Sequence, residues 1–517
     1  MVGMDKTNKA RVILLNPPTA AVSTELFLSL GYLAAALREK GHEVKVIDAT
    51  APYAPMSPET VKEAILDFKP HFIGVTLTIT FIAQTYVYLE SLKKIGIPVV
   101  AGGSHVNPLP EEALAHGVDI IVIGEGERTI VELADYFCGN RNNIEAINGL
   151  CFKDDHGSVR RTAPRSLIQD IDEIPFPAFE DFPIRNYTGS DDPASNPVFW
   201  SVFTSRGCPF NCTFCCGFNV FGRTYRLRSA ENIFKEISHL VGTYGVKKIT
   251  FQDDEILLSR ERVLKLCDLI KKSGLKFKMS VRSRIDSIDD ELLEKLREAG
   301  LCRISFGIES WNNDTLKRIK KRYSTKEIEK GMKTLERIRF PHIHLNAIVG
   351  FPWETKEHLR TNLDMLSKIP RSLHVFLTIC ALIPYPNTEL YKEYRDEYNF
   401  ADWWLDPKKH WDGFLPGQPR PLFFSLARSM ATLYVPDRYW NYSRRRKRQL
   451  EWFTWKAYGL LLKRHFNFGD RATIYLLARM SHAAWNISSK LEHALFKFVP
   501  ARLVTRVEDE LSFKKTE

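Results

Sequence analysis

Four of the nine cysteines in this 517-residue chain lie within nine positions, in the stretch "CPFNCTFCC". Cys208, Cys212 and Cys215 have the spacing C-x3-C-x2-C, and Cys216 follows directly. Three thiolates in this pattern suit a [4Fe–4S] cluster and leave one iron open, which is typical of catalytic rather than structural metal sites. The alternatives are a zinc site that uses all four thiols and a group of inert buried cysteines. We expect Cys216 to be a spare residue that packs against the loop.

The cysteine loop follows a predicted strand at 198–207 and opens a series of apolar strands separated by helical patterns. The later strands are predicted at 247–255, 276–284, 303–310, 342–350 and 372–380. Six β/α units in succession predict a partial TIM-type (β/α)6 barrel, whose active site lies at the carboxyl ends of the strands.

The N-terminal part of the chain carries a second alternating series, with strands predicted at 10–18, 43–50, 72–79, 98–103 and 119–127. This pattern indicates an α/β fold with a doubly wound, Rossmann-like parallel sheet, which binds ligands beyond the carboxyl ends of its strands. Small residues let the backbone approach a ligand closely. The candidate binding residues at these ends are Thr76, Thr78, Gly102, Gly103, Ser104, His105, Gly124, Glu125 and Gly126.

The domain boundaries follow from changes in composition. We expect a ligand-binding domain at 1–140, a Pro- and Asp-rich linker at 141–195, the barrel at 196–400 and a mainly helical C-terminal domain at 401–517. Residues 420–517 carry 19 basic and 8 acidic residues, which accounts for the net charge of +11 of the whole chain.

The basic tail has three interpretations, because residues 437–466 interleave five consecutive basic residues with tryptophans. The simplest is a solvated basic helix beside an aromatic core. Peripheral association with an anionic membrane is the second, since basic and aromatic side chains favour its interface. Nucleic acid is disfavoured, because no nucleic-acid-binding module is recognised. The N-terminus lacks a signal-peptide pattern, and residues 72–89 are better explained as a strand, a loop and a helix than as a membrane span. A cytoplasmic protein is therefore expected.

The cysteine loop resembles the radical S-adenosylmethionine (SAM) superfamily, whose motif is C-x3-C-x-aromatic-C with Phe214 in the aromatic position. The resemblance implies that a reduced cluster passes an electron to SAM at the open iron. That step releases a 5′-deoxyadenosyl radical, which abstracts hydrogen from an unactivated carbon. A flavodoxin or ferredoxin-like protein would supply the electron.

Further motifs extend the resemblance along the barrel. "FQDDEI" resembles the motif that binds the SAM amine and implies this role for Asp253 and Asp254, with a helix N-cap as the alternative for either one. "FGIES" implies a ribose or carboxylate contact for Glu309. Arg282 and Arg284 end the third strand, where the family often has a basic residue facing the SAM carboxylate; surface charge is the alternative.

The remaining motifs concern adenine and a second cofactor. "AIVGFPWET" resembles the adenine-contacting region around Val349 and Gly350, although its spacing departs from the full pattern. "GGSHVNPLPEEAL" and "DIIVIGEGERTIVEL" resemble the cobalamin-binding class of the superfamily, over residues 10–390. The D-x-H-x-x-G motif is missing at 48–52, so no histidine from that motif ligates cobalt. His105 is left as a candidate for cobalt, with a loop histidine bonded to backbone as the alternative.

The resemblance implies a cobalamin-dependent radical SAM methyltransferase acting on a hydrophobic, lipid-like or anionic small molecule. The alternative is an anaerobic oxidative cyclase like the one acting on magnesium-protoporphyrin monomethyl ester, because that family shares the domain order. A methylthiotransferase would require three further cysteines clustered in the N-terminal domain. A cobalamin sensor with a silent barrel would bind the cofactors without cleaving SAM.

Overall fold

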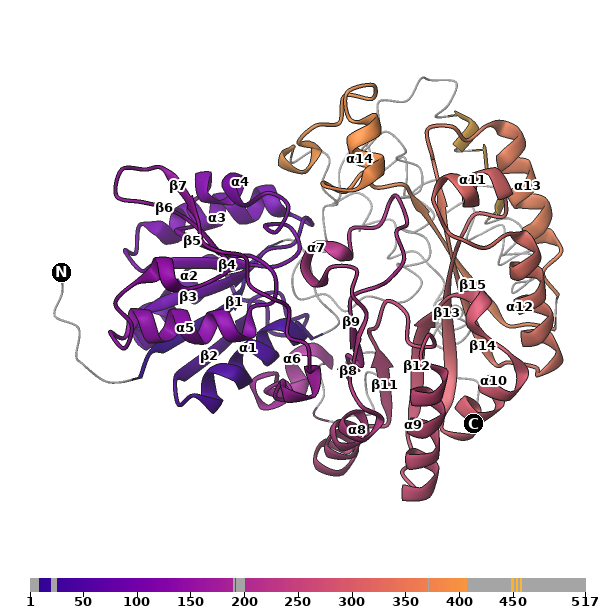
Figure 1. Cartoon of the computed structure of the whole chain (residues 1–517), viewed down its shortest axis with the longest axis horizontal. Coiled ribbons are helices and arrows are strands. Elements are labelled where there is room, and N and C mark those ends of the chain that lie inside the picture. The colour runs from indigo at the N-terminus through magenta and orange to yellow at the C-terminus, as the bar shows by residue number, and fades with distance from the viewer. Residues whose placement is uncertain are drawn as a thin grey trace, which may run out of the picture.

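Two α/β halves lie side by side in the structure, which is a computed structural model (Figure 1). It describes residues 9–19, 26–188, 191, 200–370, 372–406 and, near the C-terminus, 448–450, 452–453 and 456–457. The helical C-terminal domain expected at 401–517 lies mostly outside the described residues. Among those that are described, Leu450, Phe453 and Ala457 are buried.

The N-terminal half is a seven-stranded sheet in the order β2-β1-β3-β4-β5-β6-β7. Its first five strands are parallel and confirm the doubly wound prediction. They are β1 (Arg11–Asn16), β2 (Glu43–Asp48), β3 (Phe72–Thr76), β4 (Val99–Gly102) and β5 (Ile120–Val122). The side chains of β1, β3, β4 and β5 are mostly apolar and buried, as expected for parallel strands covered on both faces. Strand β2, at the edge of the sheet, is more polar and mostly half-buried.

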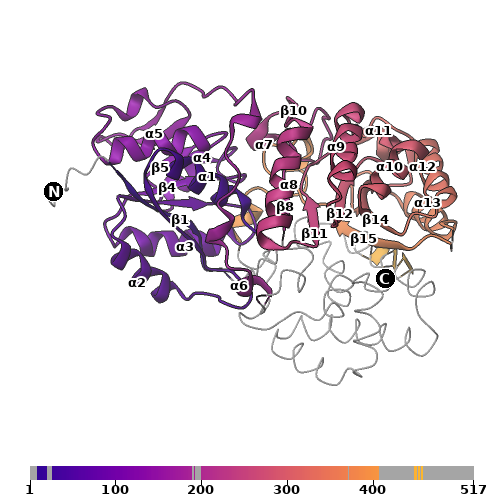
Figure 2. The same cartoon turned by 90° about the horizontal axis from the view of Figure 1, so that it is seen from below.

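Helices connect these strands in the right order for βαβ units. They are α1 (Leu28–Glu39), α2 (Pro58–Phe68), α3 (Ile82–Lys93), α4 (Pro110–Ala115) and α5 (Glu127–Phe137). Helix α1 packs against α5, and α5 lies on the opposite side of the sheet from α2 and α3 (Figure 2). Residues 72–89 form β3, a loop and the start of α3, as predicted. None of the helices described is long and apolar enough to cross a membrane.

The segment predicted as a linker at 141–195 is partly sheet, which corrects that boundary. Strand β6 (Leu150–Lys153) pairs antiparallel with β5, and β7 (Val159–Arg161) pairs antiparallel with β6. Asp154 closes their hairpin by accepting hydrogen bonds from the backbone of His156 and Ser158 at 3.0 and 2.9 Å. The side chains of β7 are all exposed, so this edge strand has no hydrophobic run by which the sequence would reveal it. The rest of the segment contains η1 (Ile144–Ala146), η2 (Ile171–Glu173), η3 (Phe179–Asp181) and α6 (Ile184–Thr188).

The second half confirms the partial barrel. Its six parallel strands form an open sheet in the order β15-β14-β13-β12-β11-β8. They are β8 (Ser201–Val202), β11 (Lys248–Phe251), β12 (Lys278–Ser283), β13 (Leu301–Glu309), β14 (His342–Val349) and β15 (Val375–Ala381). A small antiparallel hairpin of β9 (Ser205–Arg206) and β10 (Arg226–Leu227) follows the first strand.

Helices cover one side of this sheet (Figure 2). The main ones are α8 (Ala230–Tyr244), α9 (Arg260–Ser273), α10 (Asp290–Glu298), α12 (Thr325–Arg337) and α13 (Lys356–Ser367). Shorter elements are α7 (Phe218–Phe221), η4 (Ile285–Ser287), α11 (Asn313–Arg318), α14 (Glu389–Tyr394) and η5 (Trp403–Leu405). Alternate strand residues such as Ile304 and Phe306 are fully buried, whereas Ser305 between them is only half-buried. The sheet therefore has one apolar and one more polar face.

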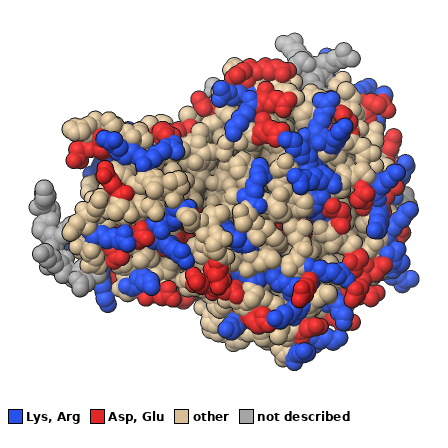
Figure 3. Space-filling model, in the orientation of Figure 1, with Lys and Arg blue, Asp and Glu red and all other residues tan. Residues whose placement is uncertain are grey.

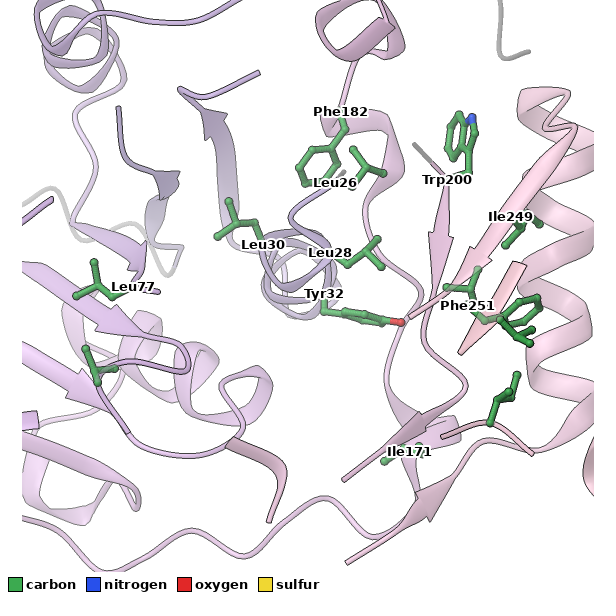
Figure 4. Close-up of a cluster of buried hydrophobic side chains, with 14 of the residues drawn as sticks. Leu26, Leu28, Leu30, Tyr32, Leu77, Ile171, Phe182, Trp200, Ile249 and Phe251 are labelled. Carbon is green, nitrogen blue, oxygen red and sulfur yellow. The ribbon is translucent and has the colours of Figure 1, made fainter. Parts of the chain in front are cut away.

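The two halves share a continuous hydrophobic core at the start of α1. Figure 4 shows Leu28 and Tyr32 reaching from α1 toward the barrel side, where Trp200 and Phe251 lie. A Cβ atom at Gly31 would lie 2.9 Å from Cβ of Pro177, so α1 approaches the connecting segment closely only because this residue is glycine. The relative position of the two sheets is thus set by packing, which matters for the sites at their facing edges.

Candidate functional site

The four clustered cysteines lie in the loop between β9 and α7, after the first barrel strand, as predicted. All four are half-buried and none forms a disulfide. The backbone N–H of Gly217 donates a hydrogen bond to Sγ of Cys215 at 3.4 Å. Burial raises the pKa of Cys208 to about 11 and that of Cys216 to about 12. Thiols in such a loop become thiolates when a metal binds them.

The donor set suits an iron–sulfur cluster better than a single zinc ion. No three His, Cys, Asp or Glu side chains within the described ranges are arranged to hold one metal ion. A four-iron cluster takes thiolates on separate irons, so its ligands do not have to converge on one point. The assignment of Cys208, Cys212 and Cys215 as the three ligands stays a prediction.

The two aspartates at the end of β11 have different environments. Asp253 is buried, and its carboxylate accepts hydrogen bonds from the backbone N–H and the hydroxyl of Thr204 at 3.1 and 2.8 Å and from Ser205. Asp254 is exposed and, within the described residues, accepts no hydrogen bond. A Cβ at Gly217 would lie 3.4 Å from Oδ2 of Asp254 and 3.5 Å from Sγ of Cys215. Only Asp254 thus offers an open carboxylate beside the cysteine loop.

Glu309 ends β13 in a left-handed backbone conformation, with φ of +64°. The strand register shifts between Gly307 and Glu309, which turns the glutamate out of the regular strand pattern. Its carboxylate pairs with Nζ of Lys321 at 2.9 Å, and both side chains are about one-tenth exposed. Burial lowers the pKa of Lys321, but the Glu309 carboxylate outweighs burial and holds it above its usual value. The sequence pattern did not point to Lys321, because its contact with Glu309 is made by the fold and not by neighbouring residues.

The two arginines at the end of β12 also differ. Arg284 is buried, and its guanidinium stacks 4.0 Å from the ring centroid of Phe210 and 4.7 Å from that of Tyr323. It also donates two hydrogen bonds to Asp286, at 2.9 and 2.8 Å. Arg284 therefore supports the cysteine loop through Phe210 rather than standing open for a ligand. Arg282 is exposed and has no such partner among the described residues.

The residues assigned to adenine lie at the end of β14. Gly350 has φ of +92°, and its backbone N–H donates to Glu354 at 2.7 Å. Phe351 is buried and meets the ring of Phe214 edge-on, with centroids 6.5 Å apart. Phe214 thus connects the cysteine loop to the end of β14, whatever ligand the two segments hold.

A cavity of about 400 Å³ lies where the carboxyl ends of the N-terminal strands face the barrel. The molecular surface is hollowed between the two halves (Figure 3). Eight of the nine residues expected to bind a ligand in this domain line the cavity; they are Thr76, Thr78, Gly102, Gly103, Ser104, Gly124, Glu125 and Gly126. Gly103 has φ of +111°, and its missing Cβ would lie 2.6 Å from the carbonyl oxygen of Leu77. The cavity is lined by small residues, by apolar side chains of α1 and by barrel residues such as Phe203 and Gln252. This lining suits cobalamin held between the two domains.

Glu125 lines this cavity, but its carboxylate is occupied by arginines of the barrel. It accepts from Arg206 at 2.7 Å and from Arg226 at 2.8 Å, and the backbone N–H of Ile168 donates to it at 2.8 Å. Glu127 also pairs with Arg206. We call this group of four side chains the interdomain ion pair. The expected cofactor contact of Glu125 stays a prediction, since the residue lines the cavity while its carboxylate is paired with arginines. The sequence shows that Arg206 lies two residues before Cys208. Its partners Glu125 and Glu127 are distant along the chain, so only the fold reveals them.

His105 does not line the cavity, which corrects its assignment as a cofactor-binding residue. Its ring is buried, and Nε2 lies 2.8 Å from Oε1 of Glu112. Tyr86 and Trp404 also donate to this carboxylate, at 2.9 and 2.8 Å. The histidine is therefore part of a structural contact between the N-terminal domain and the segment after the barrel. Its partner is a carboxylate rather than the backbone expected as the alternative.

Comparisons with known proteins agree with this architecture. The B12 binding domain model matches residues 26–134, and the Radical SAM superfamily model matches residues 202–366. The chain is similar in fold to the cobalamin-dependent S-adenosylmethionine radical enzyme OxsB, solved with aqua-cobalamin and S-adenosylmethionine bound. That match has a TM-score of 0.65 at 16% identity and covers 98% of this chain and 79% of OxsB.

Two curated relatives align over most of the chain. The uncharacterized methyltransferase PH0819 of Pyrococcus horikoshii is 33% identical over 392 residues, 74% of this chain and 82% of that protein. The anaerobic magnesium-protoporphyrin IX monomethyl ester cyclase of Cereibacter sphaeroides is 29% identical over 431 residues, 77% of this chain and 67% of that protein. The family's cofactors are a [4Fe–4S] cluster, SAM and cobalamin. The chain therefore belongs to the cobalamin-dependent radical SAM methyltransferase family.

Proposed function

We propose that this enzyme transfers a methyl group to an unactivated carbon of a small-molecule substrate. One observation carries the proposal: the expected cobalamin cavity and the cysteine loop adjoin. The cavity is lined by Arg206, two residues before Cys208, and by Val220 and Phe221 of α7, which follow Cys216 closely. A methyl donor in the cavity would therefore lie beside the site that generates the radical.

The chain's own residues have distinct roles in this proposal. Cys208, Cys212 and Cys215 hold the cluster, and Asp254 binds the SAM ammonium because a carboxylate is its natural partner. Phe214 and Gly350 shape the pocket for the rest of SAM. When bound, the three cofactors supply hydrogen-atom abstraction and methyl transfer, while the protein orients the reactants and excludes water.

Isotope labelling tests the reaction. The reconstituted holoenzyme is incubated without oxygen with reductant, SAM labelled with ¹³C in its methyl group and extracts as a substrate source. We expect 5′-deoxyadenosine and a product that is heavier by one labelled methyl group. Formation of 5′-deoxyadenosine without any labelled product would contradict methyl transfer.

The second candidate is an oxidative cyclase, which is favoured by the cyclase relative that aligns over 77% of the chain. The same incubation in H₂¹⁸O separates the two reactions. Oxygen from water in the product, without the labelled methyl group, would indicate the cyclase. Cofactor binding without any SAM cleavage would indicate a sensor.

An external electron donor and a membrane contact complete the proposal. A flavodoxin or ferredoxin-like protein supplies the electron, which is tested by replacing the chemical reductant with each of them. The basic tail at 437–466, which lies almost entirely outside the described residues, associates peripherally with anionic membrane. Cosedimentation with phosphatidylglycerol vesicles at low salt, lost at high salt, is the expected result; no pelleting at low salt would overturn it.

A further inference from the structure

The six-stranded sheet of the barrel has a polar face, which we call the inner face. It consists of the strand positions that alternate with the buried apolar ones and turn away from the helices. The strand register places Ser280 beside Arg303, Arg282 beside Ser305 and Ser305 beside His344, so these side chains share this face. They are half-buried or exposed, apart from Ser280. The inner face is therefore not part of the hydrophobic core.

The charges on the inner face are of one sign. Four cations and two imidazoles occupy it, namely Lys248, Lys278, Arg282, Arg303, His342 and His344. Glu309 is the one carboxylate in the six strands, and it is paired with Lys321. On the outer helices, by contrast, cations alternate with carboxylates (Figure 3) and pair with them, as Lys271 does with Glu298 at 2.7 Å.

The imidazole at the centre of the face is held neutral by its partners. Arg303 can only donate, so Nδ1 of His344 accepts from it at 2.9 Å. Nε2 of His344 then carries the proton and donates to the hydroxyl of Thr378 at 2.7 Å. Burial, followed by the charges of Arg303 and Arg282, lowers the pKa of His344 to about 3. In the middle of the inner face, the positive charge is therefore carried by Arg282 and Arg303 and not by His344.

Arg282 is the open cation of this group. Within the described residues its guanidinium makes no hydrogen bond or ion pair, whereas Arg284 two residues later makes both. Strand β12 lies between β11, which Asp254 follows, and β13, which carries Arg303. Arg282 therefore lies between the expected SAM site and the middle of the inner face. Gln252, which directly follows β11, lines the expected cobalamin cavity. The inner face therefore adjoins this cavity at Gln252. A substrate near Arg282 would have both cofactors as neighbours.

We propose that the substrate carries an anionic group, a carboxylate or a phosphate, which Arg282 binds on the inner face, with Arg303 diagonal to it on the neighbouring strand. A guanidinium presents a fork of donors that matches both oxyanions. This inference rests on the proposed function, because it assigns the substrate class of the same site. SAM also has a carboxylate, and it is the second source of this ligand chemistry.

Binding of a simple anion tests the proposal. Inorganic pyrophosphate and succinate are titrated calorimetrically into the anaerobic holoenzyme already saturated with SAM, so that the SAM carboxylate is in place. Three variants are compared with the parent: Arg282→Gln, Arg282→Lys and, as a control, Lys333→Gln, which removes an exposed cation from α12 on the other side of the sheet. SAM affinity and 5′-deoxyadenosine formation are measured on the same preparations.

We expect the parent and Lys333→Gln to bind at least one of the two anions at one site. Arg282→Gln should weaken this binding by about tenfold to a hundredfold, with partial rescue by Arg282→Lys and an unchanged SAM affinity, because one charge-assisted contact is lost. A fall in SAM affinity with unchanged anion binding would assign Arg282 to the SAM carboxylate and overturn the proposal. Failure of both anions to bind an enzyme that still cleaves SAM would also overturn it, and would leave the proposed function standing.

Discussion

The two halves of the molecule place ligands at the same edge of a parallel sheet but with different chemistry. At the N-terminal sheet the edge is made of glycines, threonines and apolar side chains, and the carboxylate of Glu125 is paired with arginines of the barrel. At the barrel edge, Asp254 and Arg282 stand open. In the proposed enzyme, the first edge would recognise its ligand by shape and the second by charge. Variants at the two edges should therefore fail in different ways.

The sharpest contrast lies within the cysteine loop. Cys212→Ala should abolish both the absorbance of the [4Fe–4S] cluster and the formation of 5′-deoxyadenosine, because a cluster ligand is lost. Cys216→Ala is the matched control and should keep both, since three thiolates already hold the cluster and its fourth iron is left open. Iron content, the visible spectrum and SAM cleavage are measured after anaerobic reconstitution. Loss of the cluster in Cys216→Ala would contradict the three-ligand assignment.

The second prediction concerns the interdomain ion pair that joins the two edges. Arg206 is buried between Glu125 and Glu127, so Arg206→Met leaves Glu127 buried without its cation and Glu125 with Arg226 alone. We expect the free energy of unfolding to fall by about 3–5 kcal/mol. Arg128→Met removes a pair with Glu173 whose side chains are 55% and 62% exposed, and it should cost about 0–1 kcal/mol. Thermal unfolding of the two variants checks this, and equal costs would show that the buried group does not hold the domains.

The sequence predicted what depends on local pattern. The alternation of apolar strands with helical patterns predicted both sheets, and the cysteine spacing predicted the cluster-binding loop. Both patterns are formed by residues that are close together in the sequence. It missed β6 and β7, because the apolar run of β6 is only three residues long and the side chains of β7 are all exposed. It misassigned His105, and it did not reveal that the carboxylate of Glu125 is paired with arginines. Their partners, such as Arg226 and Glu112, are set by how distant segments pack. Strand-end residues are found by pattern, but whether a charge among them is open or paired follows only from tertiary contacts.

A third prediction separates adjacent residues at the barrel edge. Asp254→Asn should weaken SAM binding by about tenfold to a hundredfold with little change in stability, since an open carboxylate loses its charge-assisted contact. Asp253→Asn should instead destabilise the fold, because its carboxylate accepts several hydrogen bonds from Thr204 and Ser205. Equilibrium dialysis with labelled SAM and thermal unfolding distinguish the two. The reverse pattern would exchange the assigned roles.

The fourth prediction is a pH dependence of stability from Glu125. Burial raises the pKa of Glu125, but the hydrogen bonds from Arg226 and Arg206 outweigh burial and hold the pKa below its ordinary value of 4.5. The resulting stabilisation is complete above pH 4.5 and is lost as the pH falls through the lower folded pKa, with a slope of at most about 1.4 kcal/mol per pH unit. Glu125→Gln should flatten this acid limb in urea unfolding between pH 5 and 3. An unchanged slope would mean that other carboxylates set it.

The smallest effect is expected where shape alone recognises the ligand. Gly102 lines the cavity, and a Cβ there would meet the backbone oxygen of Val122 at 3.9 Å, an ordinary contact that the fold tolerates. Gly102→Val should therefore fold normally but bind cobalamin about five- to tenfold more weakly, the effect of roughly 1 kcal/mol of overpacking. Gly242→Val on α8, where a Cβ meets nothing within 4 Å, is the control. Cobalamin bound per chain is measured by absorbance at fixed free cobalamin. Equal cobalamin binding by both variants would place the cofactor elsewhere and remove the basis for calling this edge a shape-recognising site.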